Sequence, residues 1–79
     1  MRVYLTSEFL KELTNCDSHI IKKALAQIKK LEQNPEAGKP LKYLHKNHRS
    51  IRIKPYRIIY SLEGENVTLE TIKHRKDAY

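Results

Sequence analysis

The sequence predicts an α+β domain in which a helical hairpin packs on one face of a small, mainly antiparallel sheet. Apolar residues recur with helical spacing as far as Leu31, whereas from Ile51 onward they alternate with polar residues. The segment Glu63-Gly64-Glu65-Asn66 is typical of a tight turn between two strands. The predicted element order is β-α-α-β-β-β. The 79 residues leave room for one domain, residues 1–79.

The first elements are a short strand and a helix of about two turns. Val3-Tyr4-Leu5 reads as the strand, and Thr6 as the N-cap of a helix that ends near Asn15. Glu8 lies in the first turn, where the helix dipole favours an acidic residue. The apolar face of this helix is expected to consist of Phe9, Leu10 and Leu13.

A longer second helix is predicted to follow with almost no linker. Asp17 or Ser18 is its expected cap, and Asn34-Pro35 ends it because the residue before a proline disfavours the helical region. Its apolar stripe is expected to consist of Ile20, Ile21, Ala24, Leu25, Ile28 and Leu31. Short linkers make neighbouring helices antiparallel, so the two helices form a hairpin.

The second half is predicted to form the rest of the sheet. Residues 36–48 read as an ordered connection whose leucines, Leu41 and Leu44, pack against the domain. Residues 51–54 alternate isoleucine with Arg52 and Lys54, which predicts a half-buried strand with cations on an open face. Pro55-Tyr56 is the expected turn before a strand that begins with residues 57–60. The last strand runs from Val67 to about Lys73.

The basic charge is concentrated in one stretch. The chain has 16 Lys and Arg against 9 Asp and Glu, a net charge of +7. Residues 37–62 contain no acidic residue, and their cations are Lys39, Lys42, Lys46, Arg49, Arg52, Lys54 and Arg57. An uninterrupted basic block indicates a polyanionic partner. Nucleic acid is the first expectation and an acidic protein the second. An anionic membrane comes third, because the block lacks an amphipathic helical pattern.

A second concentration of functional groups closes the sequence, as His74-Arg75-Lys76-Asp77-Ala78-Tyr79. The planar arginine fork matches phosphate oxygens, and tyrosine offers an aromatic face and a phenolic hydroxyl. Together with the basic block, this cluster indicates a site that handles RNA.

Composition also narrows the compartment and the cofactors. The single cysteine, Cys16, excludes an internal disulfide and suits a reducing compartment, so a cytoplasmic protein is expected. No apolar run approaches 18 residues, so neither a signal peptide nor a membrane span is expected. A magnesium site would need more carboxylates than Asp77 supplies, and the histidines lack a zinc pattern. Phosphate-binding glycine loops are missing as well. We therefore expect no metal and no cofactor.

Metal-free RNA cleavage fits this composition better. The ribose 2′-OH attacks its own phosphodiester and leaves a 2′,3′-cyclic phosphate and a free 5′-OH. Arginine and lysine can neutralise the charge that develops on the phosphate. A histidine or a tyrosine whose pKa is lowered by neighbouring cations can accept the proton.

The sequence resembles the RelE/ParE superfamily of toxin–antitoxin toxins, and the RelE branch in particular. The match rests on Tyr56-Arg57-Ile58-Ile59-Tyr60, on Ile72-Lys73-His74-Arg75-Lys76-Asp77-Ala78-Tyr79 and on the predicted element order, and it spans essentially the whole chain. The resemblance implies a RelE-like fold and a ribosome-dependent mRNA endonuclease that cuts in the A site. It also implies a cognate RelB-like antitoxin that silences the toxin.

The resemblance further implies roles for single residues. Arg57 matches the strand arginine that stabilises the transition state or acts near the leaving group, and Arg75 matches the arginine that contacts phosphate. Tyr79 matches the tyrosine that stacks on a base or serves as general base. His74 is expected to share proton transfer. The chain lacks the further C-terminal helix of some relatives, which is expected to place the terminal carboxylate near this site.

Other basic residues complete the expected site. Arg52 and Lys54 lie where the family places a basic pair on the preceding strand. If Ser50 occupies one of those positions, Arg49 or Arg52 substitutes for it. The residues expected to bind RNA or the ribosome are Lys39, Lys42, Lys46, Arg49, Lys73 and Lys76.

Two other functions stay open at this point. A ParE-like toxin that poisons DNA gyrase would share the fold, although such a toxin has no need of a positioned tyrosine. A small RNA-binding or ribosome-associated protein without activity would explain the charge. It would give no reason for the arrangement of Arg57, Arg75 and Tyr79.

Overall fold

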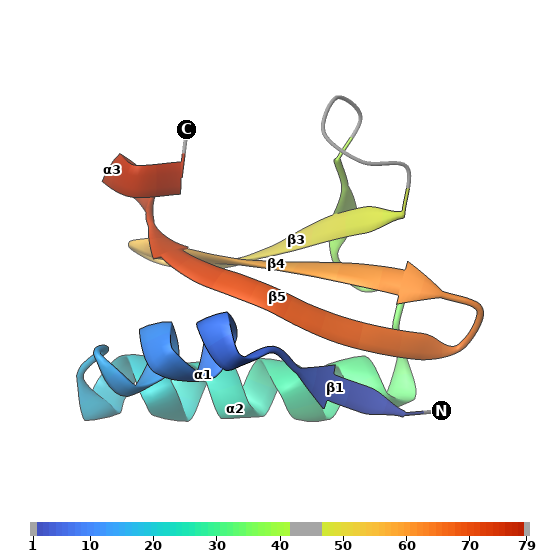
Figure 1. Ribbon diagram of the computed structural model, residues 1–79, viewed down its shortest axis with the longest axis horizontal. Coiled ribbons are helices and arrows are strands. Elements are labelled where there is room, and N and C mark those ends of the chain that lie inside the picture. Colours follow the sequence, from blue (N-terminus) through green and yellow to red (C-terminus); the bar gives the residue numbers. More distant parts are fainter. Residues whose placement is uncertain (1, 42–46, 79) are drawn as a thin grey trace.

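In the computed structural model, two helices cover one face of a five-stranded sheet (Figure 1). Residues 2–41 and 47–78 are described. The elements are β1 (Val3–Leu5), α1 (Ser7–Thr14), α2 (Ser18–Gln33), β2 (Lys39–Pro40), β3 (His48–Ile53), β4 (Tyr56–Glu63), β5 (Asn66–His74) and α3 (Arg75–Ala78). The strand order is β1-β5-β4-β3-β2, with β1 parallel to β5 and the other neighbours antiparallel. The predicted fold class is confirmed.

Side-chain caps begin both long helices. The Thr6 hydroxyl accepts the Phe9 N–H at 3.0 Å and donates to the Glu70 carbonyl at 2.9 Å, which ties the start of α1 to β5. A carboxylate oxygen of Asp17 accepts the Ile20 N–H at 3.0 Å at the start of α2. Each cap satisfies an N–H that has no partner within its own helix.

The core lies between the helices and the sheet. Its largest fully buried side chains are Tyr60, Phe9, Leu31, Ile58, Leu69 and Val67. Two leucines predicted to face this core are on the surface, because Leu10 is 45% exposed and Leu25 is 54% exposed. Each follows a fully buried residue in its helix and therefore lies about 100° further round the helix axis. Ile20, Ala24 and Leu31 are the buried positions of α2.

Two elements of the structure were not predicted. β2 pairs Lys39 with Ser50 and Pro40 with Arg49, within the segment expected to be an irregular connection. The terminal segment forms the helical turn α3, whose Arg75 N–H donates to the Pro55 carbonyl at 2.8 Å. The turn between β3 and β4 consists of Lys54 and Pro55, one residue earlier than predicted. Leu44 lies outside the described residues.

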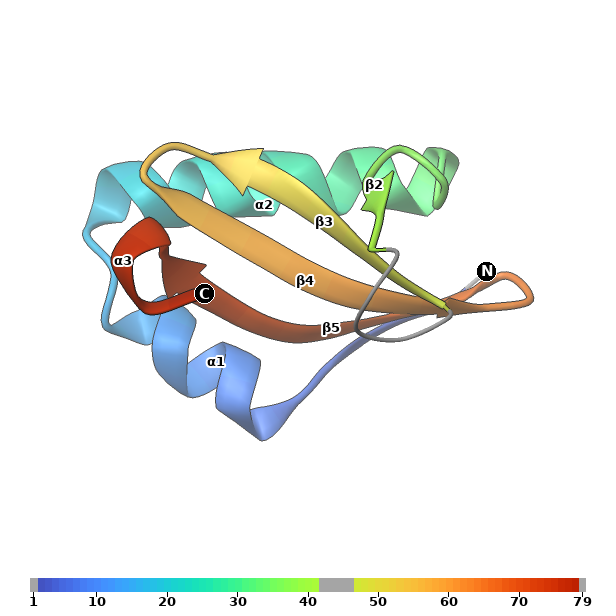
Figure 2. The ribbon, with the colours of Figure 1, turned by 90° about the horizontal axis from the view of Figure 1, so that it is seen from above.

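The two long helices, α1 and α2, leave the other face of the sheet uncovered except for the short helix α3 at one end (Figure 1). Seen from above, α3 lies at the end of the sheet where β3 turns into β4 (Figure 2). This end of the uncovered face, with the hairpin and α3 around it, is where most of the predicted site residues lie.

Candidate functional site

Three cations stand in one row across the sheet. Arg52 in β3 is the Cα partner of Arg57 in β4, and Arg57 is the partner of Lys73 in β5. Directly opposite residues of antiparallel strands point to the same face. Their neighbours Ile53, Ile58 and Ile72 are buried in the core, so by strand alternation the three side chains leave the sheet on the face opposite α1 and α2, although Lys73 then reaches Glu12 of α1 at the sheet edge.

This row is unfavourable for folding by itself. Like charges directly opposite each other destabilise a sheet, on a scale of about 0.2–1 kcal/mol for each pair. An anion bound above Arg52 and Arg57 would remove that repulsion. The pairing of the two arginines therefore concentrates positive charge at one point of the sheet.

The β3–β4 hairpin and α3 complete a hollow next to this row. It has a volume of about 160 Å³ and is lined by Arg52, Lys54, Pro55, Tyr56, Arg57 and Arg75. Arg75 reaches it because the backbone of α3 is fixed to Pro55. The sheet and the terminal turn thus bring four predicted catalytic cations, Arg52, Lys54, Arg57 and Arg75, to one place.

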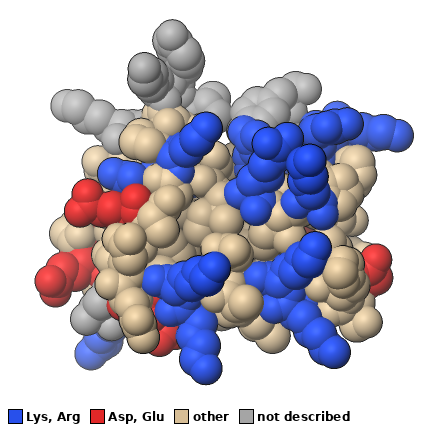
Figure 3. Space-filling model, turned by 180° about the vertical axis from the view of Figure 1, so that it is seen from behind, with Lys and Arg blue, Asp and Glu red and all other residues tan. Residues whose placement is uncertain are grey.

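Four of the residues described in the lining of this hollow are cations, and none of the described lining residues is acidic. The ion pairs between described residues are Arg49 with Glu36 and Lys73 with Glu12. Figure 3 shows Lys and Arg gathered over the sheet side of one face, with a second group over the helices, while Asp and Glu lie toward the margins. The electrostatics suit a phosphate ligand.

Lys73, predicted to bind RNA, forms an ion pair with a residue of helix α1. Its Nζ lies 2.6 Å from Oε2 of Glu12 in α1. The other oxygen of Glu12 accepts the Ile72 N–H at 3.1 Å and the Thr71 hydroxyl. Burial raises the pKa of Glu12, but the hydrogen bonds from Lys73, Thr71 and Ile72 outweigh burial, so the pKa is below its usual value. Glu12 thus stays a carboxylate that holds α1 to the edge of β5.

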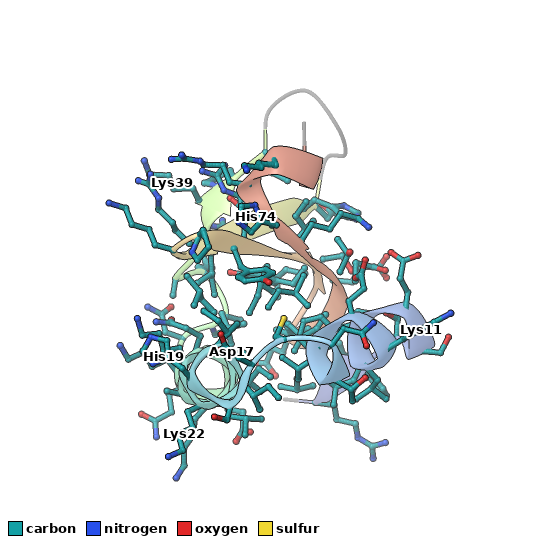
Figure 4. The ribbon with its side chains drawn as sticks, turned by 90° about the vertical axis from the view of Figure 1, so that its left-hand side faces the viewer. Lys11, Asp17, His19, Lys22, Lys39 and His74 are labelled. Carbon is teal, nitrogen blue, oxygen red and sulfur yellow. The ribbon has the colours of Figure 1, made fainter. Side chains whose placement is uncertain are left out.

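His74 lies apart from the cationic hollow. It is the Cα partner of Tyr56, and the two rings pack edge to face with centroids 5.3 Å apart. It lines a different hollow, of about 210 Å³, together with Glu12, Asn15 and Cys16. Figure 4 shows it beside α3 at the end of the sheet. Its Nδ1 accepts the Lys76 N–H at 3.1 Å, so the ring proton of the neutral imidazole is on Nε2.

The remaining predicted RNA-binding residues are distributed unequally. Lys39 lines a second hollow that also contains Arg52 and Arg57. Arg49 is separate, because its guanidinium donates to the Gly38 carbonyl at 2.8 Å and the Glu36 carbonyl at 3.0 Å. Lys76 is exposed on α3. Two other predicted RNA-binding residues, Lys42 and Lys46, and the predicted catalytic residue Tyr79 lie outside the described residues.

Sequence reasoning did not identify Glu12 as a partner of the site, or Pro55 and Tyr56 as part of its wall. Tyr56 belongs to the Tyr56–Tyr60 motif, which is the sequence signal that points to it. Nothing in the sequence links Glu12 to Lys73, because the contact joins residues about sixty positions apart.

Burial raises the pKa of the Cys16 thiol, which argues against Cys16 as a nucleophile.

The described residues lack two kinds of feature, a membrane-spanning helix and a cluster of metal ligands. Across residues 2–41 and 47–78, no helix is long and apolar enough to cross a membrane. The same residues contain no group of three or more His, Cys, Asp or Glu that could hold a metal ion.

Solved structures of similar fold include toxins of toxin–antitoxin systems. The toxin fold of the RelB–RelE antitoxin–toxin complex from Methanococcus jannaschii matches with a TM-score of 0.82 and 26% identity, covering 96% of this chain and 94% of that one. The toxin–antitoxin complex RelBE2 from Mycobacterium tuberculosis matches with a TM-score of 0.81 and 24% identity, covering 94% and 96%. The isolated Escherichia coli RelE toxin matches with a TM-score of 0.77 and 17% identity, covering 91% and 81%.

Sequence comparison gives the family. No curated protein matches the chain at a significant level. A family model described as the ParE toxin of the type II toxin–antitoxin system parDE matches residues 3–79, almost the full length. Together with the RelE-like fold, this match confirms the predicted superfamily. The chain belongs to the ParE toxin family, within the RelE/ParE superfamily, and is a toxin of a type II toxin–antitoxin system.

Proposed function

We propose that this toxin is a ribosome-dependent endoribonuclease that cleaves mRNA in the cytoplasm without a metal or a cofactor. The observation that carries the proposal is the convergence of Arg52, Lys54, Arg57 and Arg75 on one hollow of the uncovered sheet face. A hollow of about 160 Å³ lined by cations suits one phosphate group and its immediate neighbours.

The proposed reaction is an internal transfer of the phosphate. The 2′-oxygen attacks the phosphorus, the bond from phosphorus to the 5′-oxygen breaks, and the products are a 2′,3′-cyclic phosphate and a 5′-OH. Arg57 and Arg75 stabilise the extra charge of the transition state, and Arg52 and Lys54 hold the phosphate. Tyr79 stacks on a base or accepts the proton of the 2′-OH.

The described lining of the hollow supports a dependence on the ribosome. In its described lining there are cations and Tyr56, but neither a carboxylate nor an imidazole. Charge stabilisation is therefore well supplied, while groups for proton transfer are scarce. Programmed ribosomes would hold the mRNA in an in-line geometry and contribute the missing groups. Naked RNA should be cut slowly or not at all.

The proposed protein partner is a RelB-like antitoxin with an acidic segment. Similar toxin folds were solved as complexes with RelB-type antitoxins. The chain has a net charge of +7, so such a segment would cover the basic face. Affinity for the encoded antitoxin should rise as salt is lowered, and an affinity indifferent to ionic strength would argue against this attraction.

Single-turnover cleavage on programmed ribosomes tests the catalytic assignment. Arg57→Ala and Arg75→Ala should each slow cleavage about a hundredfold, the scale seen when one preorganised donor is removed. Arg2→Ala is the matched control, because Arg2 is exposed and precedes β1 at the other end of β5. Near-wild-type rates for both site variants would refute the assignment.

A second candidate function has its own observation. The family model that matches the chain is the one for ParE toxins, which favours a ParE-like toxin that inhibits DNA gyrase. In that case the cationic hollow would bind an acidic surface or DNA and would not cleave RNA. The geometry of Arg57 and Arg75 favours cleavage.

A further inference from the structure

A second hollow adjoins the first one across two shared arginines. It has a volume of about 330 Å³, and its lining includes Gln27, Gly38, Lys39, Ser50, Arg52 and Arg57. It opens at the edge of the sheet because β2 has only two residues and leaves β3 uncovered after Ser50. Arg52 and Arg57 line both hollows, so the two hollows adjoin and one extended ligand would fill both.

One wall of the second hollow is fixed by hydrogen bonds. The buried Tyr60 hydroxyl donates to the Pro35 carbonyl at 2.7 Å and accepts the Gly38 N–H at 2.9 Å. Arg49 donates to the Gly38 carbonyl from the other side. A Cβ on Gly38 would lie 2.7 Å from the Tyr60 ring, so only glycine lets the chain pass this closely. The hollow is therefore built in advance of any ligand.

The lining combines positive charge with neutral hydrogen-bonding groups. Lys39, Arg52 and Arg57 supply the charge, and the Gln27 amide and Ser50 hydroxyl supply donors and acceptors. Among the described residues, the Gln27 side chain has no hydrogen-bond partner. No carboxylate belongs to the described lining. A ligand that fits is anionic on one side and offers hydrogen-bonding edges on the other.

We propose that the second hollow is a subsite for a nucleotide of the RNA strand, next to the phosphate in the first hollow. Its volume reaches the lower end of the range for small-molecule sites, about 300–1,000 Å³, whereas the first hollow is half as large. Lys39 contacts the phosphate of this nucleotide, and Gln27 and Ser50 read the edge of its base. Gln27 is thus a specificity-determining residue, an assignment that rests on the proposed RNA cleavage.

Mapping of mRNA 5′ ends tests the base-reading role. Gln27→Ala is compared with Gln33→Ala, an exposed glutamine of the same helix that does not line the hollow. Gln27→Ala should reduce the preference for one base beside the cut by about tenfold, within the scale of a lost bidentate base contact. The control should keep the wild-type profile. Unchanged preferences in Gln27→Ala, with an unchanged melting temperature, would overturn the inference.

A binding experiment separates failure of the subsite from failure of the proposed function. Adenosine and uridine 5′-monophosphate are titrated into the full chain and followed by amide NMR signals. The nucleotides should shift the Gln27 side-chain signal and the Gly38 and Lys39 amides, whereas inorganic phosphate should act mainly around Arg57 and Arg75. Such shifts would support the subsite even if wild-type protein cleaved no mRNA. If a hexaglutamate peptide shifts these signals and the nucleotides do not, the hollow docks protein and the inference is wrong.

Discussion

Replacing Glu12 by alanine is expected to destabilise the domain by about 2 kcal/mol, although Glu12 belongs to no hydrophobic core. Its carboxylate accepts hydrogen bonds from the Ile72 N–H, the Thr71 hydroxyl and Lys73 Nζ. β1 pairs with β5 only from Val67 to Leu69, so beyond that point Glu12 satisfies an N–H of the sheet edge. The Glu12 carboxylate therefore accepts a backbone hydrogen bond of β5 that a neighbouring strand would otherwise accept.

The magnitude follows from the exposure of the three donors. A hydrogen bond to a charged group contributes about 1.5–3 kcal/mol when its partners are shielded from water. The Lys73 side chain is 40% exposed, and an ion pair of that kind contributes about 0–1 kcal/mol. Water would replace part of the other two contacts in the variant. The sum is about 2 kcal/mol for Glu12→Ala and about 1 kcal/mol for Glu12→Gln, which keeps one acceptor oxygen.

Urea unfolding followed by circular dichroism measures this loss. A loss of 2 kcal/mol corresponds to a melting temperature lower by about 10 °C in a domain of this size. Glu32→Gln is the control, because Glu32 is exposed on α2 and no hydrogen bond or ion pair of its side chain is found among the described residues. The slope of the unfolding free energy with urea should be unchanged. If Glu12→Gln and Glu32→Gln are equally stable, the reasoning is refuted.

The same contact has a pH signature. The pKa of Glu12 is below its ordinary value of 4.5 in the folded protein, so the unfolded chain binds the proton more tightly. The contribution of Glu12 is therefore fully present above pH 4.5 and is lost as the pH falls below 4.5 through the folded pKa. The stability difference between wild type and Glu12→Gln should shrink over that window. A difference that stays constant down to pH 3 would contradict the assignment.

Three further predictions concern single sites. Gly38→Ala should destabilise by about 2 kcal/mol through overpacking against Tyr60, whereas Gly64→Ala, in open space at φ +59°, should cost about 1 kcal/mol; equal melting temperatures would contradict this. His74→Asn keeps an acceptor for the Lys76 N–H and His74→Gln does not, so amide hydrogen exchange at Lys76 should speed up only in the glutamine variant. In single-turnover cleavage, a Tyr79 that only stacks predicts a small loss for Tyr79→Phe and a large one for Tyr79→Ala. A general base predicts equal losses.

Local signals in the sequence were sufficient for most of the fold. Thr6 and Asp17 cap the helices as expected, and the alternation after Ile51 placed Arg52 on the uncovered face. The apolar stripe predicted for α2 is wider than the face that the helix buries. Spacing alone cannot fix how far a helix is rotated toward its sheet, and Leu25 lies beyond the part that makes contact.

The candidate site was predictable where residues lie on one strand pair and not where distant segments meet. The hairpin alone brings Arg52 next to Arg57. Arg75 joins them through a backbone contact with Pro55, and Glu12 removes Lys73 from the row through a contact with α1. Arg49 lies on the core side of β3, opposite Tyr60, and its guanidinium donates a hydrogen bond to the Gly38 carbonyl. Such contacts depend on tertiary packing, which one sequence does not reveal.

The most direct test of the central claim compares two targets in parallel. Purified toxin is incubated with programmed ribosomes, with the same mRNA alone, and with DNA gyrase and supercoiled plasmid. We predict mRNA fragments with a 5′-OH that begin in the A site, little cleavage of the naked mRNA, and unchanged gyrase activity. Inhibition of gyrase without mRNA cleavage on the ribosome would contradict it.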